Sequence, residues 1–215
     1  MPALLDFPLT PANTLADLHL GKIPLERIRM QPAPGTATIE DADLLEQKEN
    51  RLFELYDGVL VEKPMGYNES DLAMYLGYVL NAHVIPRKLG KVTGPDGMLE
   101  IPKGQLRMPD VAFVSRRKLV QGPKPRPRVP RLVPDLAVEV LSRSNTREEM
   151  ARKRREYFAA GVIQVWQVDP KKRIVDVFTA PETFTTLTEK DTLHGEPFLP
   201  GFELKLSELF AQLDD

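Results

Sequence analysis

The chain has 215 residues, of which 42% are hydrophobic and 28% charged, a composition that excludes a disordered chain and fits one domain with a substantial core. Its formal net charge of -2 excludes a globally basic nucleic-acid binder, so any such surface must be local. The sequence has no cysteine, which excludes disulfides and thiolate metal sites.

The sequence predicts neither a membrane protein nor a secreted one. No apolar run approaches the roughly 20 residues that a membrane-spanning helix needs. Residues 1–10 lack the basic start and long apolar core of a secretory signal. Together with the absence of cysteine, these features predict a cytoplasmic protein.

The first 38 residues are rich in proline and weakly patterned. We therefore expect residues 1–38 to form an N-terminal extension packed on a domain that comprises residues 39–215. This domain is expected to begin with a short surface helix over residues 39–47, which has acidic residues in its first turn.

Residues 51–63 predict a β-hairpin, because Asp57-Gly58 separates two apolar runs. Glu54 stands inside the first of these runs, where the pattern leads us to expect an apolar side chain. An amphipathic helix is predicted to follow over residues 68–84.

A second hairpin is predicted around the turn at residues 94–97, followed by a strand over residues 106–115 in which Asp110 opens an apolar run. Pro109 fits the start or the edge of that strand. Residues 116–131 then contain seven Lys and Arg, four Pro and no acid. Such a tract fits a solvated loop as well as a strip that contacts a nucleic-acid backbone.

Residues 136–141 have the length and composition of a buried strand, yet Glu139 lies in the middle of it. The helix that follows is predicted to begin with a capping box at residues 146–149 and to end at Gly161. Lys153 shares a helix face with the apolar residues of that helix, where a lysine requires a carboxylate or another anion.

Further strands are predicted over residues 162–168, 173–179, 184–188 and 202–206, with a terminal helix at 207–213. The strand–helix–strand unit around residues 136–168 implies a right-handed crossover and hence a mixed sheet. We predict the α/β class, bordering on α+β.

Three acids thus interrupt apolar strands, and one lysine interrupts the apolar face of a helix: Glu54, Asp110, Glu139 and Lys153. Each alone could be a strand-end acid or a lysine whose stem covers apolar surface. Together they predict a site in which carboxylates bind a divalent cation such as Mg²⁺ beside a positive charge, as metal-dependent phosphodiester hydrolysis requires. Acidic residues and a lysine also form structural ion pairs, so the spacing alone leaves that alternative open.

The motifs that carry these residues resemble those of the Uma-two family of restriction-endonuclease-like proteins. The motifs are ELYDG at residues 54–58, RMPDV at 107–111, PDLAVEVLS at 134–142, and WQVDP at 166–170 with Lys153 and Tyr157 before it. The resemblance covers residues 40–210 and implies the PD-(D/E)xK nuclease fold, a mixed central sheet flanked by helices.

The resemblance also implies roles for individual residues. Asp110 and Glu139 would be ligands of Mg²⁺ or Mn²⁺, with the Val140 carbonyl as a third ligand, and Glu54 would be an auxiliary acid. The superfamily's lysine would stand at position 141, which is Leu141 here, so Lys153 on the following helix is expected to replace it. The histidine that many family members carry near the start of the helix at residues 68–84 is absent.

We therefore predict a metal-dependent endonuclease that hydrolyses DNA phosphodiester bonds and acts as a possible homodimer, because one active site makes one cut. A catalytically inactive nucleic-acid-binding or structural protein that retains the fold is the alternative. Arg154, Arg155 and other cations of the basic tract and of the helix after Glu139 would contact phosphates. The individual residues that we predict to bind nucleic acid are Arg107, Lys124, Arg126, Arg128, Arg147 and Arg152.

Overall fold

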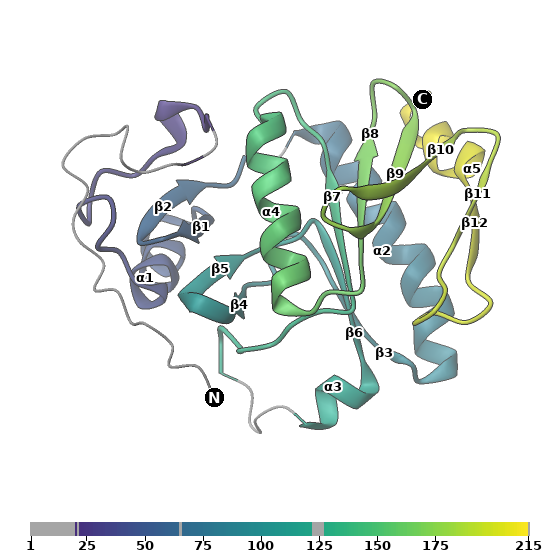
Figure 1. The fold of residues 1–215 in the computed structure, drawn as a ribbon, viewed down its shortest axis with the longest axis horizontal. Coiled ribbons are helices and arrows are strands. Elements are labelled where there is room, and N and C mark those ends of the chain that lie inside the picture. Colours follow the sequence, from purple (N-terminus) through teal and green to yellow (C-terminus); the bar gives the residue numbers. More distant parts are fainter. Residues whose placement is uncertain (1–19, 21, 65, 122–126, 215) are drawn as a thin grey trace.

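The computed structural model describes residues 20, 22–64, 66–121 and 127–214 (Figure 1). Its centre is a six-stranded sheet with the order β10–β9–β8–β7–β6–β3. β7 and β8 are parallel and the other neighbours are antiparallel, so the sheet is mixed as predicted. Its strands are β3 (Gly90–Thr93), β6 (Val111–Ser115), β7 (Leu136–Val140), β8 (Gln164–Asp169), β9 (Ile174–Ala180) and β10 (Thr183–Thr188).

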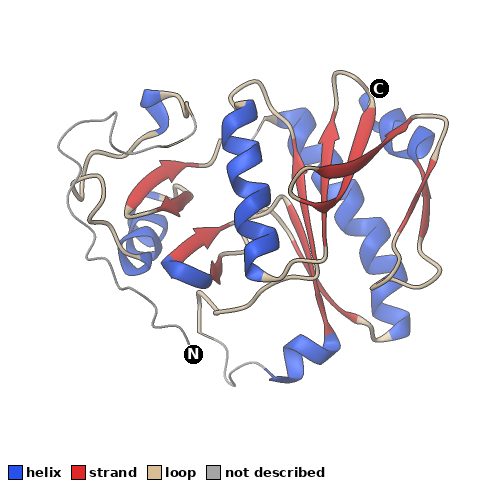
Figure 2. Cartoon of the chain, in the orientation of Figure 1, coloured by secondary structure: helices blue, strands red, loops and turns tan. Residues whose placement is uncertain are grey.

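Two helices cover the two faces of this sheet (Figures 1 and 2). α4 (Arg147–Ala160) is the crossover between the parallel strands β7 and β8, and α2 (Tyr67–Arg87) packs on the opposite face. The capping box predicted for α4 is present, with the Thr146 side chain accepting from the Glu149 backbone N–H. Gly161 ends the helix with a φ of 101°, a left-handed conformation that glycine adopts without strain.

The residues of β7 alternate between these two helices, because successive side chains of a strand point to opposite faces. Val138 belongs to the apolar cluster that contains Leu76 of α2. Ala137 packs in the cluster that contains Tyr157 of α4. Glu139 therefore lies on the α4 face of the central sheet.

A second, four-stranded sheet with the order β2–β1–β5–β4 lies on the far side of α4 from the central sheet (Figure 1). It contains the predicted hairpin, and α1 (Ile39–Glu49) packs against it through Ala42. α4 is thereby placed between the two sheets. The strands are β1 (Phe53–Tyr56), β2 (Val59–Glu62), β4 (Leu99–Ile101) and β5 (Gln105–Arg107), with a 3₁₀ turn at Pro102–Gly104.

Two predictions for the chain segments that connect the two sheets were wrong. The turn at residues 94–97 does not close a hairpin, because β3 pairs with β6 and β4 pairs with β5. The single strand predicted over residues 106–115 is split into β5 in the second sheet and β6 in the central sheet. Pro109 lies at the break, where the chain passes from one sheet to the other and no ladder hydrogen bond from its nitrogen is needed.

The basic tract begins with a short helix, α3 (Arg116–Gln121), where a loop or an extended strip was predicted. Beyond the central sheet, the chain closes with β11 (Thr192–His194), β12 (Glu203–Lys205), α5 (Leu206–Phe210) and a 3₁₀ turn (Ala211–Leu213), which pack beside α2. No helix in the described part of the chain is long and apolar enough to cross a membrane.

The described part of the N-terminal extension, which includes a 3₁₀ turn at Leu25–Arg27, packs on the β1–β2 hairpin. Ile23 and Ile28 lie in one apolar cluster with Tyr56. Arg27 forms a buried ion pair with Glu149 of α4, at 2.9 Å. The extension therefore contacts both α4 and the second sheet where these two elements pack together.

The hairpin turn at Gly58 provides a test of this packing. Gly58 has a φ of +77°, and a Cβ there would lie 2.5 Å from the carbonyl carbon and oxygen of Gly35. Gly104 has a similar φ of +67° but no atom within 4 Å of its Cβ position. Both Ala variants carry the strain of a positive φ, and we expect Gly58→Ala to lower the free energy of unfolding by about 1–3 kcal/mol more than Gly104→Ala. Urea unfolding of the two variants measures the difference, and equal losses would contradict the close approach of Gly35.

Candidate active site

Asp110 and Glu139 lie opposite each other where β6 begins and β7 ends. The antiparallel β6–β7 register ends with Val111 opposite Val138, and extending it by one residue places Asp110, just before β6, opposite Glu139. Residues in opposite positions share a face of the sheet. The Oδ2 atom of Asp110 accepts a hydrogen bond of 2.7 Å from the Val140 backbone N–H, which holds the end of β7 against the start of β6.

Two side chains of α4 reach Glu139. The Nζ atom of Lys153 lies 3.2 and 3.4 Å from the two carboxylate oxygens. The Tyr157 hydroxyl, one helical turn further on, donates to Oε1 at 2.7 Å. Only 4% of Glu139 and 3% of Lys153 is exposed to solvent, so the charges interact in a region of low polarity.

Glu54 reaches the same lysine from the second sheet. Its Oε2 atom lies 2.9 Å from Lys153 Nζ and accepts a hydrogen bond of 2.8 Å from Tyr56. Its Oε1 atom accepts from the Met108 backbone N–H at 3.0 Å. Lys153 therefore connects carboxylates from both sheets, and the four predicted catalytic residues converge in one buried cluster.

Lys63 is a member of this cluster that the sequence analysis missed. Its Nζ atom lies 2.8 Å from Asp110 Oδ1 and also donates to the carbonyls of Pro95 and Met108. Lys63 follows β2 directly, and a lysine at the end of a strand is normally a solvated residue. The only sequence signal was its place after an apolar strand of the hairpin that carries Glu54.

The pKa values in this cluster follow from burial and from the balance of its three carboxylates against two ammonium groups and the nearby Arg107 guanidinium. Burial, together with the charges of Asp110 and Glu54, raises the pKa of Glu139 to about 7 despite the nearby Lys153. Burial also acts on Glu54, but Lys153, Arg107 and Lys63 outweigh it and lower the pKa of Glu54 to about 2. Burial lowers the pKa of Lys153, but Glu139 and Glu54 outweigh it and raise that pKa well above its usual value, so Lys153 is a permanent cation.

Asp110 and Glu139 offer the donors that a small divalent cation uses. Mg²⁺ is commonly bound by one or two carboxylates and keeps several waters. Across the described ranges, no group of three or more acidic, histidine or cysteine side chains forms a metal-binding cluster. The residues therefore fit a two-carboxylate site rather than a full protein cage. Val140, whose carbonyl is predicted as a third ligand, adjoins Glu139 and donates its N–H to Asp110.

Arg107 does not fit its predicted role as a phosphate contact. It is fully buried, and its guanidinium donates to the carbonyls of Leu55 (2.6 Å) and Leu106 (2.8 Å). It also forms an ion pair with Glu156 of α4 and lies 3.7 Å from the centre of the Tyr56 ring. Arg107 is therefore part of the packing between α4 and the second sheet.

The other predicted phosphate contacts differ in their accessibility. Arg128 is half exposed and paired with Asp43 and Glu46 of α1. Arg152 is mostly buried and pairs with Asp57 and Glu156. Arg147 is exposed at the start of α4. Lys124 and Arg126 lie outside the described residues.

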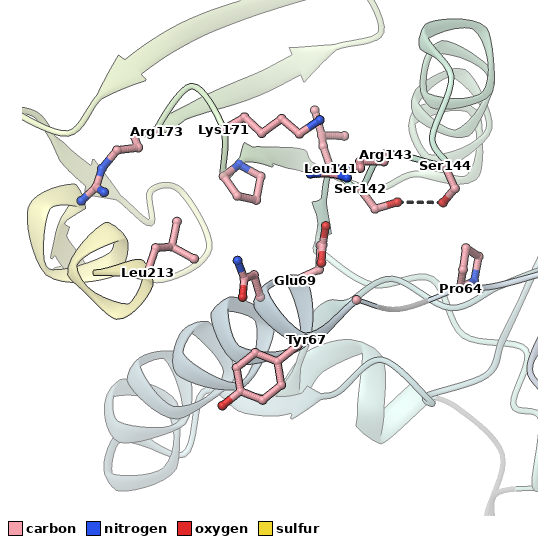
Figure 3. A pocket seen from close by; sticks show the side chains of 13 residues that line it. Pro64, Tyr67, Glu69, Leu141, Ser142, Arg143, Ser144, Lys171, Arg173 and Leu213 are labelled. Atoms are coloured by element: carbon pink, nitrogen blue, oxygen red, sulfur yellow. Dashed lines mark hydrogen bonds between the residues drawn. The ribbon is translucent and has the colours of Figure 1, made fainter. Parts of the chain in front are cut away.

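A cleft of about 750 Å³ begins at Leu141, two residues after Glu139 (Figure 3). Leu141 and Ser142 continue from Glu139 and Val140 into its wall, and Pro64 enters directly after Lys63. The start of α2 and the β8–β9 turn form the remaining sides. Its charged lining residues are Arg143, Lys171, Arg173 and Glu69, so positive charge predominates.

The architecture is shared with a solved structure, described as "a putative nuclease belonging to DUF820" from Anabaena variabilis. The superposition has a TM-score of 0.67 at 18% sequence identity and covers 75% of this chain and 91% of that chain. The chain thus has a restriction-endonuclease-like α/β fold, as predicted.

The family follows from the sequence match. The family model described as "Uma2: Putative restriction endonuclease" matches residues 39–207, and the chain belongs to this family. The resemblance to the Uma-two family that the motifs indicated is thereby confirmed. No curated protein matches the chain.

The raised pKa of Glu139 predicts a pH effect on stability. The folded state holds a proton on Glu139 up to about pH 7, whereas a carboxyl of ordinary pKa, 4.5, in the unfolded chain releases it earlier. Stability from this group is therefore present below pH 4.5 and is lost as the pH rises through 7. In urea unfolding with EDTA, we expect the wild type to lose about 2 kcal/mol more than Glu139→Gln between pH 5.5 and 8.5. Parallel pH profiles of the two proteins would contradict the raised pKa.

Proposed function

We propose that this protein is a metal-dependent endonuclease that hydrolyses DNA phosphodiester bonds. The observation that carries the proposal is the placement of Asp110, just before β6, beside the end of β7 that carries Glu139, with the Lys153 ammonium directly beside Glu139. Membership of a family described as "Putative restriction endonuclease" and a fold shared with a structure described as "a putative nuclease" support it.

In this proposal, Asp110 and Glu139 hold Mg²⁺ or Mn²⁺. When bound, the metal would lower the pKa of a water molecule and stabilise negative charge on the phosphate. Metal binding requires that Glu139 be ionised and that Asp110 release the Lys63 ammonium, since Lys63 lies 2.8 Å from Asp110. The metal ion would therefore displace a proton from Glu139 and the Lys63 ammonium from Asp110. Because less Glu139 is protonated at higher pH, the ion would bind more tightly as the pH rises through 7.

Lys153 acts as a fixed positive charge, because its raised pKa excludes a role as general base at neutral pH. An ammonium has three donors, and Glu54 and Glu139 are the carboxylates that Lys153 contacts in the described part of the chain. These contacts comprise both oxygens of Glu139 and Oε2 of Glu54, so Lys153 would give up one of the two longer contacts to Glu139 to donate to a water molecule or a phosphate oxygen. Glu54 and Tyr157 are positioning residues, because Glu54 holds Lys153 and Tyr157 holds Glu139.

A structural protein that retains the fold is the second candidate, and one observation favours it. Lys63 and Lys153 already provide each of the three carboxylates with a buried counter-ion. Such a network is complete without metal. The two candidates differ in whether the protein binds a divalent cation at Asp110.

Metal binding tests this difference by isothermal titration calorimetry at pH 8. We expect the wild type to bind Mn²⁺ and Asp110→Asn to bind it at least about tenfold more weakly, because half of the anionic pair is lost. Lys63→Met should bind Mn²⁺ about tenfold more tightly, because the competing ammonium is gone. Lys118→Met is the matched control, since Lys118 pairs at 3.2 Å with Asp135, before the start of β7. Absence of binding to any of these proteins would favour the structural candidate.

DNA cleavage tests the proposed activity. We expect the purified protein to nick or cut plasmid DNA with Mg²⁺ or Mn²⁺ and Glu139→Ala to lose this activity, because one metal ligand is removed. Lys153→Met should reduce the rate on the order of 100-fold while Mn²⁺ binding persists. The measurement is supercoiled-plasmid conversion over time on gels. Wild-type rates in both variants would assign the cleavage to a contaminating nuclease.

A further inference from the structure

A row of polar residues runs from the carboxylate cluster across the central sheet. Glu139 of β7 pairs with Gln167 of β8, Gln167 pairs with Asp176 of β9, and Asp176 pairs with Thr186 of β10. Paired residues on neighbouring strands share a face, so this row lies on the α4 side. It leads from the proposed metal ligands toward the outer edge of the sheet.

The outer part of this row borders a cavity of about 550 Å³ between the start of α4 and strands β8–β10. Gln167, Asp176 and Phe184 line it, and Arg147 and Arg154 of α4 line it from the other side. The cavity shares Leu141, Ser142 and Lys171 with the cleft of Figure 3. The two spaces therefore meet at the end of β7, next to Glu139 and Val140.

Gln167 lies in the wall of this cavity, and its side-chain amide nitrogen has no hydrogen-bond partner among the described residues. The residue is only 5% exposed, and its Oε1 atom accepts a hydrogen bond of 3.1 Å from Arg154. Arginine is exclusively a donor, so the oxygen of the amide must face Arg154 and the nitrogen must face away. The Nε2 atom is buried and has no hydrogen-bond partner in the described ranges. A buried donor without a partner is costly, which points to an acceptor supplied by a ligand.

The cavity combines an aromatic surface with positive charge. Phe184 is 51% exposed, and its ring centre lies 4.7 Å from that of Phe178, which anchors it. Four cations and two acids line the space. Asp176 accepts a hydrogen bond from Thr186, and Asp169 is paired with Lys172 at 3.0 Å. Arg154 is paired with Glu182 at 3.9 Å, so the surplus of positive charge comes from Arg147 and Lys171. An exposed ring, an amide donor without a partner and this positive charge are together the chemistry that binds an unstacked nucleotide.

We propose that this cavity is a subsite for one unpaired nucleotide of the substrate strand, adjacent to the phosphate that is cleaved. The Phe184 ring stacks on the base, the Gln167 amide donates to an acceptor of the nucleotide, and Arg147 contacts its phosphate. Because a base within a duplex cannot offer its face to Phe184, the protein prefers single-stranded or locally unpaired DNA. This inference rests on the proposed function and specifies its substrate class.

Fluorescence anisotropy with the full chain in EDTA tests the subsite. The probes are a labelled 20-nucleotide oligo(dT) and a labelled 20-base-pair duplex. We expect Phe184→Ala and Phe184→Leu to weaken binding of the single strand about tenfold, the Leu variant keeping Phe178 covered while losing the flat ring. Gln167→Met, which removes the amide and keeps the side-chain length, should weaken it about threefold. Arg147→Ala should reduce the salt dependence by about one counter-ion, whereas the uncharged substitutions leave it unchanged.

Two exposed residues elsewhere serve as controls. Tyr78→Ala removes an exposed ring from α2, on the other face of the sheet, and Lys205→Ala removes an exposed cation from β12, outside the central sheet. Neither should alter binding. Equal binding of single strand and duplex by the wild type, or unchanged binding in the Phe184 and Gln167 variants, would overturn the subsite.

Metal binding separates the failure of this inference from the failure of the proposed function. Phe184→Leu and Gln167→Met should bind Mn²⁺ as the wild type does, because neither residue is a proposed ligand. If the wild type binds Mn²⁺ and cleaves DNA but the variants bind single strands normally, the subsite is wrong and the nuclease proposal stands. If the wild type binds neither Mn²⁺ nor DNA, both proposals fail.

Discussion

The contact on which the rest of the structure depends is the buried Lys153 ammonium between Glu54 and Glu139. These carboxylates come from different sheets, and the lysine comes from the helix that lies between them. Buried charges are costly unless they are paired, so each member of this cluster is stabilised only while the others are in place. The position of α4 is thereby tied to the geometry of the acidic residues.

Further ion pairs join α4 to its surroundings along its length. Arg27 reaches Glu149 in its first turn, Arg107 reaches Glu156 further on, and Arg152 extends outward to Asp57 at the hairpin turn. On the opposite side, Tyr157 packs against the central sheet and bonds to Glu139. A helix held from both sides in this way can place an ammonium group with the precision that chemistry on a phosphate needs.

The cluster is anionic by one charge, and that excess connects stability to function. Burial, with the repulsion from Asp110 and Glu54 added to it, destabilises ionised Glu139 and raises its pKa to about 7. A divalent cation would relieve the same repulsion, so the feature that costs stability in the metal-free protein favours metal binding. Lys63 opposes metal binding, because its ammonium already forms an ion pair with the Asp110 carboxylate. The proposed nuclease and the proposed structural protein thus differ in one equilibrium, the exchange of protein cations for metal.

The sequence by itself determined the local elements and the identity of the acidic residues. The capping box of α4, the Asp57-Gly58 turn and the apolar run around Glu139 depend on neighbours in the chain, and each was predicted correctly. A carboxylate or a lysine inside an apolar pattern is also visible locally, because burial of a charge is unfavourable without a partner. Glu54, Asp110, Glu139 and Lys153 could therefore be named in advance.

Only the tertiary structure decided which of these charges meet and which sheet each strand joins. Residues 94–97 looked like a hairpin turn, yet they connect two sheets, because strand partners are chosen by packing at long range. Lys63 and Arg107 look like ordinary polar residues at strand ends, and their burial follows from contacts with residues about 50 positions away. Such pairings depend on how α4 docks between the sheets, which no local pattern specifies.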